Sequence, residues 1–277
     1  EATESILNKI AIKRQKLIKE EEKKTTLQQL LYTGLRRGIS PPLNVLDKLK
    51  QAKARIALMA EIKRASPSKG DINANIDVIK QAKQYALAGA SVISVLTEPQ
   101  WFKGSINDLY NISQAIKDLK DNRPAILLKD FVETEYQIVQ ARIHGADTVL
   151  LIVARLALEK LKILINCCRQ LGMEPLVEIA NENELKIALD ADAKFIGVNN
   201  RDLHTFQVDI NKTINLNSKI SSDKRKNIHI AALSGIKDRT IVEKYETAGI
   251  DAILVGETLM KNNNPVQCIN DLLAIPI

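Results

Sequence analysis

Cysteine is scarce in this chain: only three occur among 277 residues, and two of them, Cys167 and Cys168, are adjacent. Neither this pair nor the distant Cys268 has the spacing of a zinc site or a disulfide framework. Few, unpaired cysteines are typical of a reducing compartment. We therefore predict a cytoplasmic protein, or one of the plastid stroma if a transit peptide has been removed ahead of Glu1.

Long hydrophobic runs are also missing. Charged residues interrupt every apolar segment before it reaches the roughly 20 residues that a transmembrane helix needs. Residues 1–24 are densely charged and lack the apolar core of a signal peptide. The sequence thus predicts a protein without a membrane partner.

Aromatic residues make up only 4% of the chain, although its formal charge is +7. Nucleic-acid-binding domains typically combine a clustered basic stripe with aromatic rings on which bases stack. Here the 40 lysines and arginines are spread along the whole sequence. The charge balance therefore favours a small anionic substrate over a nucleic acid.

What the chain does contain is a regular alternation of two kinds of segment. Short apolar runs rich in β-branched residues predict buried strands, and longer amphipathic stretches between them predict helices. The eight predicted strands are Ile56–Ile62, Ser91–Leu96, Pro124–Leu128, Thr148–Val153, Glu174–Glu178, Phe195–Val198, Ile228–Ala232 and Ala252–Val255. The predicted helices include Ile76–Ala88, Ile106–Leu119, Glu133–His144, Leu156–Leu171, Glu182–Leu189 and Asp238–Ala248.

Strands that are apolar throughout need cover on both faces, which is typical of a parallel sheet flanked by helices. Eight strand–helix units fill the ~250 residues of a (β/α)8 barrel. A doubly wound open sheet is the alternative, but no glycine-rich dinucleotide turn follows the first strand. We predict a single α/β domain over residues 1–277, a (β/α)8 TIM barrel with residues 1–50 as an N-terminal helical extension.

The extension contains one predicted helix within residues 4–24 and a second after Pro41-Pro42. Ile6 and Ile10 recur at helical spacing among many lysines and glutamates. Two placements are open: a packing element against the bottom or flank of the barrel, or a lid over the active-site end. The charge pattern alone favours the packing element.

Polar residues collect at the carboxyl ends of the predicted strands, where (β/α)8 barrels carry their active sites. Glu61 and Lys63 are two residues apart on the first strand and therefore lie on one face. A structural salt bridge is one explanation of this pair. Lys129 and Glu178 form a second possible pair from different strands. Burial lowers the pKa of a lysine and raises that of a glutamate, which favours proton transfer near neutral pH.

Two glycine turns follow the last two strands, Ser234-Gly235 and Gly256-Glu257. Backbone N–H groups at such turns bind phosphate, and glycine allows the ligand to approach closely. Phosphate sites recur at this position in (β/α)8 barrels. The sequence thus predicts a phosphate site between the last two strands.

The histidines give weaker indications. His144 precedes a glycine at a helix end, where a capping role is expected. His229 lies in an apolar strand, where we expect a local hydrogen bond, and His204 follows the sixth strand, where it could approach a substrate. Because the chain has no cluster of cysteine and histidine, we expect no metal.

Six motifs stand at the predicted strand ends. They are Glu61-Ile62-Lys63-Arg64-Ala65-Ser66-Pro67-Ser68, Val95-Leu96-Thr97-Glu98 with Phe102 and Gly104, Leu128-Lys129-Asp130-Phe131, Leu176-Val177-Glu178, Asn199-Asn200-Arg201-Asp202-Leu203 and Val255-Gly256-Glu257. In type and order they resemble the motifs of indole-3-glycerol phosphate synthase, an enzyme family of tryptophan biosynthesis. The resemblance extends from the N-terminal helix to the last strand.

This resemblance implies a (β/α)8 barrel whose N-terminal extension helps to cover the active site. It implies ring closure and decarboxylation of 1-(2-carboxyphenylamino)-1-deoxyribulose 5-phosphate to indole-3-glycerol phosphate, CO2 and water, without a cofactor. Lys129 would be the general acid and Glu178 the general base, with Glu61 and Asn199 orienting the reacting groups. The remaining residues would bind an anionic group (Lys63, Ser66), line the pocket (Arg201, Ser234), pack against the aromatic ring (Phe102, Phe131) or hold phosphate (Gly235, Gly256, Glu257).

Leu233 departs from the family pattern, in which a glutamate precedes the Ser-Gly turn. Leucine carries no charge and forms no side-chain hydrogen bond, so we expect reduced or retuned activity. Two other functions stay open: a Schiff-base lyase or aldolase that uses a strand lysine on a sugar phosphate, and a phosphate-binding barrel without catalysis. We expect a monomer that could associate with other enzymes of tryptophan biosynthesis.

Overall fold

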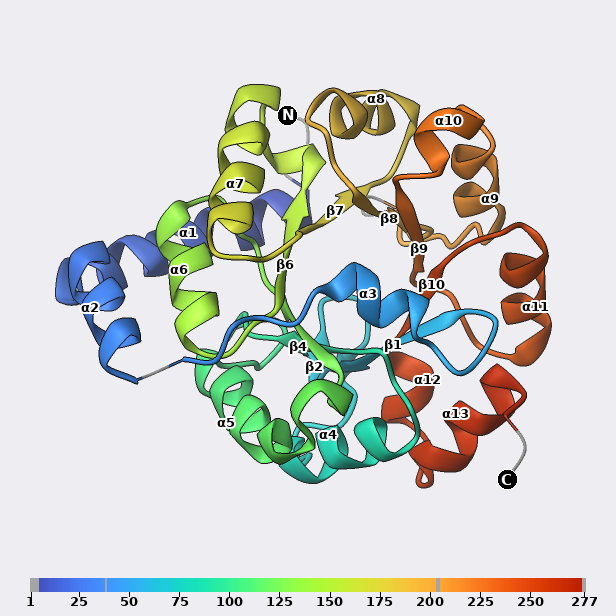
Figure 1. Ribbon diagram of the computed structural model, residues 1–277, viewed down its shortest axis with the longest axis horizontal. Coiled ribbons are helices and arrows are strands. Elements are labelled where there is room, and N and C mark those ends of the chain that lie inside the picture. Colours follow the sequence, from blue (N-terminus) through green and yellow to red (C-terminus); the bar gives the residue numbers. More distant parts are fainter. Residues whose placement is uncertain (1–4, 38, 203–204, 276–277) are drawn as a thin grey trace.

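A computed structural model describes residues 5–37, 39–202 and 205–275 of the chain. Eight parallel strands close into a barrel in the order β1-β10-β9-β8-β7-β6-β5-β4 (Figure 1). They are β1 Ala57–Ile62, β4 Val92–Leu96, β5 Ala125–Lys129, β6 Thr148–Ile152, β7 Leu176–Ile179, β8 Phe195–Asn199, β9 His229–Leu233 and β10 Ala252–Val255. The predicted (β/α)8 barrel and its eight strands are confirmed. A short hairpin, β2 Ala65–Ser66 with β3 Gly70–Asp71, follows the first strand.

Helices surround the barrel between consecutive strands (Figure 1). They are α4 Val78–Leu87, α5 Ile106–Ile116, α6 Glu135–Ile143, α7 Leu158–Gln170, α8 Glu182–Asp190, α9 Asn211–Asn217, α10 Ser222–Arg225, α11 Arg239–Thr247, α12 Glu257–Met260 and α13 Pro265–Leu273, with 3-10 turns η1 Lys117–Asn122 and η2 Val153–Arg155. All six helices that the sequence predicts are present. No described helix has both the length and the apolar character needed to cross a membrane.

Helices end before the next strand at residues in the left-handed backbone region. Gly89, Gly145 and Gly249 have φ values of 87°, 98° and 68°, and Asp192 has 60°. Glycine adopts such angles without steric cost, which is why it is common just after a helix. These turns lead into the amino ends of the strands, at the bottom of the barrel. The carboxyl ends of all eight strands therefore lie together at the top.

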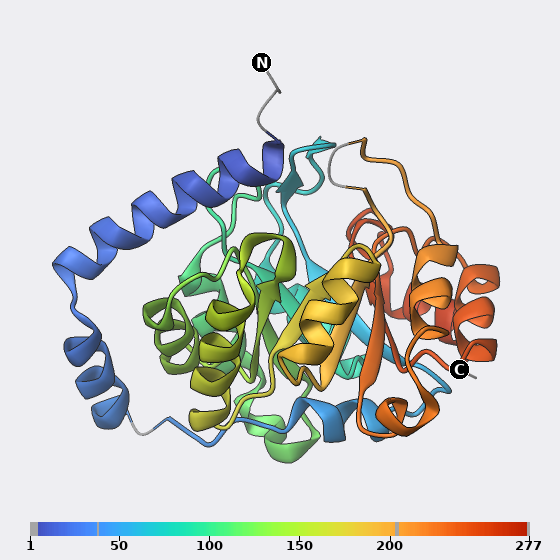
Figure 2. The ribbon, with the colours of Figure 1, turned by 90° about the horizontal axis from the view of Figure 1, so that it is seen from above.

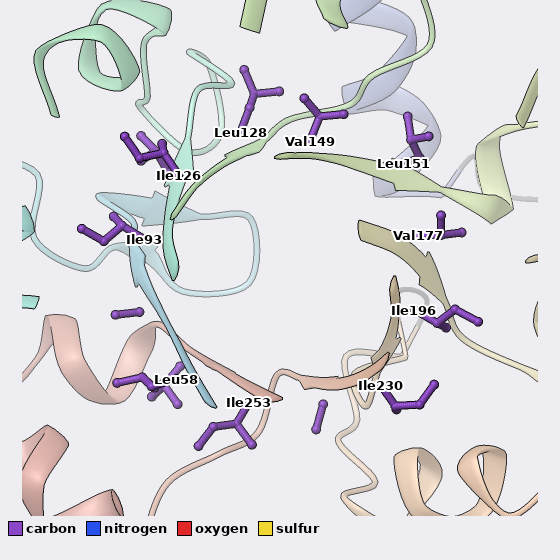
Figure 3. Close-up of a cluster of buried hydrophobic side chains, with 14 of the residues drawn as sticks. Leu58, Ile93, Ile126, Leu128, Val149, Leu151, Val177, Ile196, Ile230 and Ile253 are labelled. Carbon is purple, nitrogen blue, oxygen red and sulfur yellow. The ribbon is translucent and has the colours of Figure 1, made fainter. Parts of the chain in front are cut away.

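Alternating side chains along the strands form two hydrophobic layers. One set faces outward and packs under the helices, as Leu58, Ile126 and Ile196 do (Figure 3). The other set, including Met59 and Phe195, fills the barrel interior. Since successive residues of a strand point to opposite sides, a polar residue two positions beyond an interior residue also points inward.

Three helices precede the barrel: α1 Ile6–Lys24, α2 Leu27–Arg37 and α3 Val45–Lys50. Helix α1 lies across one end of the barrel, and α3 lies at the other (Figure 2). Val45 and Leu49 of α3 close the bottom of the interior core, whereas Ile10 of α1 belongs to its upper part near Phe131. The charge pattern favoured packing of residues 4–24 against the bottom or flank of the barrel, whereas the helix found at the bottom is α3. For α1 that expectation is wrong, because its apolar residues meet the mouth of the barrel.

Candidate active site

The carboxyl ends of the strands surround a cavity of about 160 Å³ beneath α1. Strand alternation turns Glu61 of β1, Lys129 of β5 and Glu178 of β7 into this cavity, each two positions beyond an interior core residue. The predicted site residues that line it are Glu61, Lys63, Ser66, Phe102, Lys129, Phe131, Glu178, Asn199, Arg201, Ser234, Gly235 and Glu257. The structure brings all of them together, with Gly256 as the exception.

Glu61 is the electrostatic centre of the site. Its side chain is 1% exposed and contacts Lys63 Nζ at 3.0 Å and Lys129 Nζ at 3.3 Å. Ser94 Oγ donates a third, longer hydrogen bond at 3.4 Å. Burial alone would raise the pKa of Glu61, but the two ammonium groups outweigh it and lower the pKa to about 2. Glu61 is therefore ionised at any physiological pH, and its carboxylate holds the ammonium groups of Lys63 and Lys129 in place.

Lys129 differs from the sequence-based expectation. Burial does lower the pKa of this ammonium group, yet the carboxylates of Glu61 and Glu178 outweigh burial and raise it. The expected downward shift is therefore wrong, because the prediction considered burial without the neighbouring charges. Lys129 carries a charged ammonium group that faces the cavity.

Glu178 behaves as predicted. Burial raises its pKa, and the opposing effects of Lys129 and of the Asn199 amide do not cancel this. Asn199 Nδ2 donates to Glu178 Oε1 at 3.1 Å, and its own Oδ1 accepts from the backbone N–H of Arg201 at 3.0 Å. This second bond fixes which end of the amide faces the carboxylate. The site therefore pairs a cationic acid with a carboxylate whose proton affinity is enhanced.

Aromatic and aliphatic side chains close one side of the cavity. The rings of Phe102 and Phe131 lie 6.4 Å apart with a tilt of 41°. The loop that carries Phe102 is held by Glu98, a carboxylate 1% exposed that accepts the backbone N–H groups of Gln100, Trp101 and Phe102. Such an arrangement satisfies a buried charge with backbone donors alone. These bonds hold the backbone that carries Phe102 in place.

The turn after β9 has an unusual backbone. Ser234 and Gly235 have φ values of 69° and 83°, and a Cβ on Gly235 would lie 2.3 Å from Val208 Cγ1. Asn200, which is fully buried, donates to the carbonyl of Ser234 at 3.0 Å and to Tyr245 Oη at 2.8 Å. This amide holds the strained turn in place, and only glycine fits its second position.

Gly256 lies on the neighbouring strand end but does not line the cavity. A Cβ at this position would come within 2.6 Å of Glu61 Oε1. Here glycine makes room for the buried carboxylate. Glu257, one residue later, does line the cavity, and its carboxylate contacts Lys261 at 2.7 Å and Lys69 at 3.9 Å.

A buried ion pair attaches α1 to the site. The guanidinium of Arg14 contacts both carboxylate oxygens of Asp130 at 2.9 to 3.1 Å, and both side chains are at least nine-tenths buried. Thr97 Oγ1 donates to the same carboxylate at 2.6 Å. Asp130 directly follows Lys129, so the ion pair joins the covering helix to the strand that carries the ammonium group.

The two histidines that the structure describes, His144 and His229, lie away from the cavity. His144 caps α6, and its Nδ1 lies 2.7 Å from the carbonyl of Gln140, which confirms the capping role. His229 begins β9, and its buried Nδ1 has no hydrogen-bond partner among the described residues, so the expected local bond at this atom is absent. Burial lowers the pKa of His229, which favours the neutral ring. His204 lies outside the described residues.

Sequence reasoning missed several residues of the site. Ser94 is on the inward face of β4, and its alternation with Val92 was a usable signal. The apolar residues of α1 gave no such signal, since a helix of this charge pattern also fits a solvated surface. The lining residues not predicted as site residues are Ile6, Leu7, Ile10, Pro67, Ser68, Phe206, Leu233 and Leu254.

Fold and cavity together define a (β/α)8 barrel with acid–base side chains at the carboxyl ends of its strands, the face on which barrel enzymes carry their chemistry. A family model described as indole-3-glycerol phosphate synthase matches residues 7–272. The chain belongs to the indole-3-glycerol phosphate synthase family. The resemblance found in its motifs is confirmed.

Relatives of two kinds match the chain. A multifunctional tryptophan biosynthesis protein of Phanerodontia chrysosporium is 51% identical over 98% of the chain, and an indole-3-glycerol phosphate synthase of Dehalococcoides mccartyi is 41% identical over 84%. The chain spans 34% of the length of the first relative and 86% of the second. Among solved structures, 3-hexulose-6-phosphate synthase from Salmonella typhimurium shares the fold, with a TM-score of 0.62, 14% identity and coverage of 79% of this chain and 97% of that one.

Proposed function

We propose that this chain catalyses the ring closure of 1-(2-carboxyphenylamino)-1-deoxyribulose 5-phosphate to indole-3-glycerol phosphate, with release of CO2 and water. The observation that carries the proposal is that Lys129 and Glu178, from different strands, face one cavity together with Glu61, Lys63 and Asn199. Family membership supports the same reaction. The proposal treats residues 1–277 as one catalytic domain with residues 1–50 as its extension.

The substrate has to fold so that the ring carbon bearing the carboxylate reaches the ketone carbon. Phe102 and Phe131 would pack on the aromatic ring, and α1 would exclude water from above. Lys63, whose ammonium is held by Glu61, would bind the carboxylate near Ser66. Because the site holds the two reacting atoms in contact, much of the entropic cost of ring closure is already met on binding.

Proton transfer then completes the reaction. A C–C bond forms at the ketone carbon, the bond to the carboxylate breaks, and CO2 leaves as its electron pair restores the aromatic ring. As the C–C bond forms, the ketone oxygen takes a proton from Lys129 and becomes a hydroxyl, and Lys129 regains a proton from solvent. The hydroxyl then departs as water with a second proton from Lys129, while Glu178 accepts the proton that the substrate loses as the new ring becomes unsaturated, so that one proton is consumed overall. The raised pKa values of Lys129 and Glu178 support these roles, because one group holds a proton and the other binds one more readily.

The substrate phosphate would bind at the ends of β9 and β10. The strained Ser234-Gly235 turn and the backbone at Gly256-Glu257 lie on adjacent strands, and Gly235 and Glu257 both line the cavity. Backbone N–H groups at such turns suit a dianion. Arg201 lies at the rim, where its side chain donates to the carbonyl of Phe206 at 3.3 Å.

The experiment is steady-state turnover measured by indole fluorescence. We expect Lys129→Met to lower kcat by a factor of about 10² to 10⁴, the usual contribution of a general acid. Lys186→Met, a change of the same kind at an exposed position on α8, serves as the matched control and should leave kcat unchanged. Normal turnover by Lys129→Met would reject the assigned acid, and no turnover by the unmodified chain would favour a barrel that only binds phosphate.

A Schiff-base reaction needs an uncharged lysine, and the raised pKa of Lys129 argues against one. Reduction with borohydride in the presence of the substrate provides the test. Acid–base ring closure leaves no adduct on the protein, whereas an imine would be trapped as a covalent addition visible by mass spectrometry.

The proposal also covers the partners of this chain and its cellular location. The multifunctional relatives support association with other enzymes of tryptophan biosynthesis, and a monomeric barrel remains our expectation for this chain alone. The three free cysteines, all buried, support a reducing compartment such as the cytoplasm.

A further inference from the structure

A second cavity lies at the end of the barrel opposite the active site and encloses about 540 Å³. It is formed by residues 39–43, which lead into α3, and by the ends of α5 and α6. Figure 2 shows this leading segment across the end of the barrel away from α1. Four cationic side chains line the cavity against one carboxylate among the described residues: Lys117, Lys120, Arg123 and Arg142, with Asp121. We call it the basic pocket.

Arg142 is the buried member of this group. Its side chain is 9% exposed, and two of its N–H groups donate to the backbone carbonyls of Ala146, at 3.0 Å, and Ser40. Within the described part of the chain no carboxylate forms an ion pair with it. A guanidinium carries five N–H donors, so the two carbonyls leave three of them for another acceptor, and the charge has no directly paired carboxylate.

Asp147 is the nearest candidate for that compensation, and its bonds are already complete. Its carboxylate is 0% exposed and accepts two hydrogen bonds from Arg123, at 2.5 and 2.8 Å. It also accepts the backbone N–H groups of Leu43 and Ile126, each at 2.8 Å. Four donors occupy the roughly four acceptor sites of a carboxylate, so its bonds go to Arg123 and the backbone.

A cation without an ion-pair partner is costly in a buried position. The pKa of Arg142 agrees with this geometry. Burial lowers it, Asp147 opposes the change, and the neighbouring Arg123 lowers it further. The pKa of Lys48, which borders this region, is likewise lowered by burial and by Arg123. A bound anion would remove this cost.

The rest of the lining decides what kind of anion fits. Ile39, Pro41, Leu43 and Ile143 form an apolar side, and the ring of Tyr110 adds to it. The volume far exceeds what a bare inorganic ion would fill. We propose that the basic pocket binds a small organic phosphate, with the phosphate on Arg142, Lys117 and Lys120 and the organic body on the apolar side. Arginine and lysine together match a phosphate dianion better than a single carboxylate.

Such a ligand would join two parts of the chain. Residues 39–43 connect α2 to α3, while Lys117 and Arg142 belong to the barrel wall. Because the ligand binds only the assembled pocket, it stabilises the folded state by mass action. The site is separate from the proposed catalytic cavity and does not depend on the reaction assigned there.

Calorimetric titration with phenyl phosphate at ~0.15 M salt tests the proposal, since exposed charges are then largely screened. The titration uses the Gly235→Ala background, in which phosphate binding at the turn of the active site is expected to be weakened. Lys117→Glu with Lys120→Glu reverses two exposed charges of the basic pocket without touching its buried members. Lys160→Glu with Lys186→Glu, both exposed on α7 and α8, gives the same net charge at a distant place.

We expect one site for phenyl phosphate, with affinity at least tenfold weaker in the Lys117/Lys120 variant and changed less than twofold in the Lys160/Lys186 variant. Equal weakening in both variants would overturn the proposal, because net charge alone would explain it. Absence of binding in the background chain would overturn it as well. Tighter binding of benzoate or inorganic phosphate than of phenyl phosphate would reject the proposed ligand class.

Discussion

Glu61 supplies the sharpest test of the electrostatics of the active site. Burial would raise its pKa above the ordinary 4.5, but Lys129 and Lys63 hold it at about 2. Since a tenfold change in proton affinity equals about 1.4 kcal/mol, ionised Glu61 stabilises the native state by roughly 3 kcal/mol near neutral pH. Glu61→Gln keeps the shape of the side chain and removes that charge.

The pH range of the effect follows from the direction of the shift. A carboxyl group with a lower pKa in the folded state stabilises the protein above its unfolded pKa, and this stabilisation disappears as the pH falls through the folded pKa. Of the roughly 3 kcal/mol, about 2 kcal/mol is therefore lost between pH 6 and pH 3. Glu61→Gln should be less stable at pH 6 and should lose less stability over this range.

Urea unfolding at four pH values between 6 and 3 measures this difference. Glu178→Gln is the matched control, because burial raises the pKa of Glu178. Protonation of Glu178 thus stabilises the folded state at low pH, and this contribution is lost as the pH rises through the folded pKa. Glu178→Gln should therefore lose more free energy of unfolding between pH 6 and pH 3 than the unmodified chain does. If the free energy of unfolding fell by the same amount between pH 6 and pH 3 in the unmodified chain and in Glu61→Gln, the reasoning would be refuted.

Three further substitutions test the frame around the site. Gly235→Ala should raise KM at least tenfold with a smaller change in kcat, because its Cβ would lie 2.3 Å from Val208 Cγ1; steady-state kinetics with an unchanged KM would contradict this. Asn200→Ala removes the buried amide that holds the same turn, so KM should again rise more than kcat falls, and the reverse split would argue for a direct role in chemistry. Arg14→Met leaves Asp130 buried without its cation and should cost about 3–5 kcal/mol in urea unfolding, whereas a loss below about 1 kcal/mol would show that α1 is held by other contacts.

Period-two alternation is what made most of the fold and site predictable. The same rule that separates Leu58 from Met59 places Glu61 and Lys63 inside the barrel, and it applies to each strand independently. Parallel strands then bring all of their carboxyl ends to one face. Local pattern and global arrangement agree here, so the cavity could be foreseen without coordinates.

The features that escaped prediction depend on contacts between distant segments. Helix α2 is an exception, because Thr26 and Gln29 form a capping box at its start, a local signal that was not used. The short α9, α10 and α12 are held mainly by packing on the barrel. The placement of α1 depends on the Arg14–Asp130 ion pair, which joins residues 116 positions apart. The raised pKa of Lys129 likewise depends on two carboxylates from other strands. Neither pairing leaves a trace in local sequence.

The closure of the barrel has a consequence for when the candidate site assembles during synthesis. Strand β1 bonds to β10, and the carboxylate of Glu61 occupies space left by Gly256, 195 residues later in the sequence. A nascent chain on the ribosome therefore carries every acid–base residue long before it can use them. The candidate site should therefore assemble in one step, when β10 has emerged and closed the barrel.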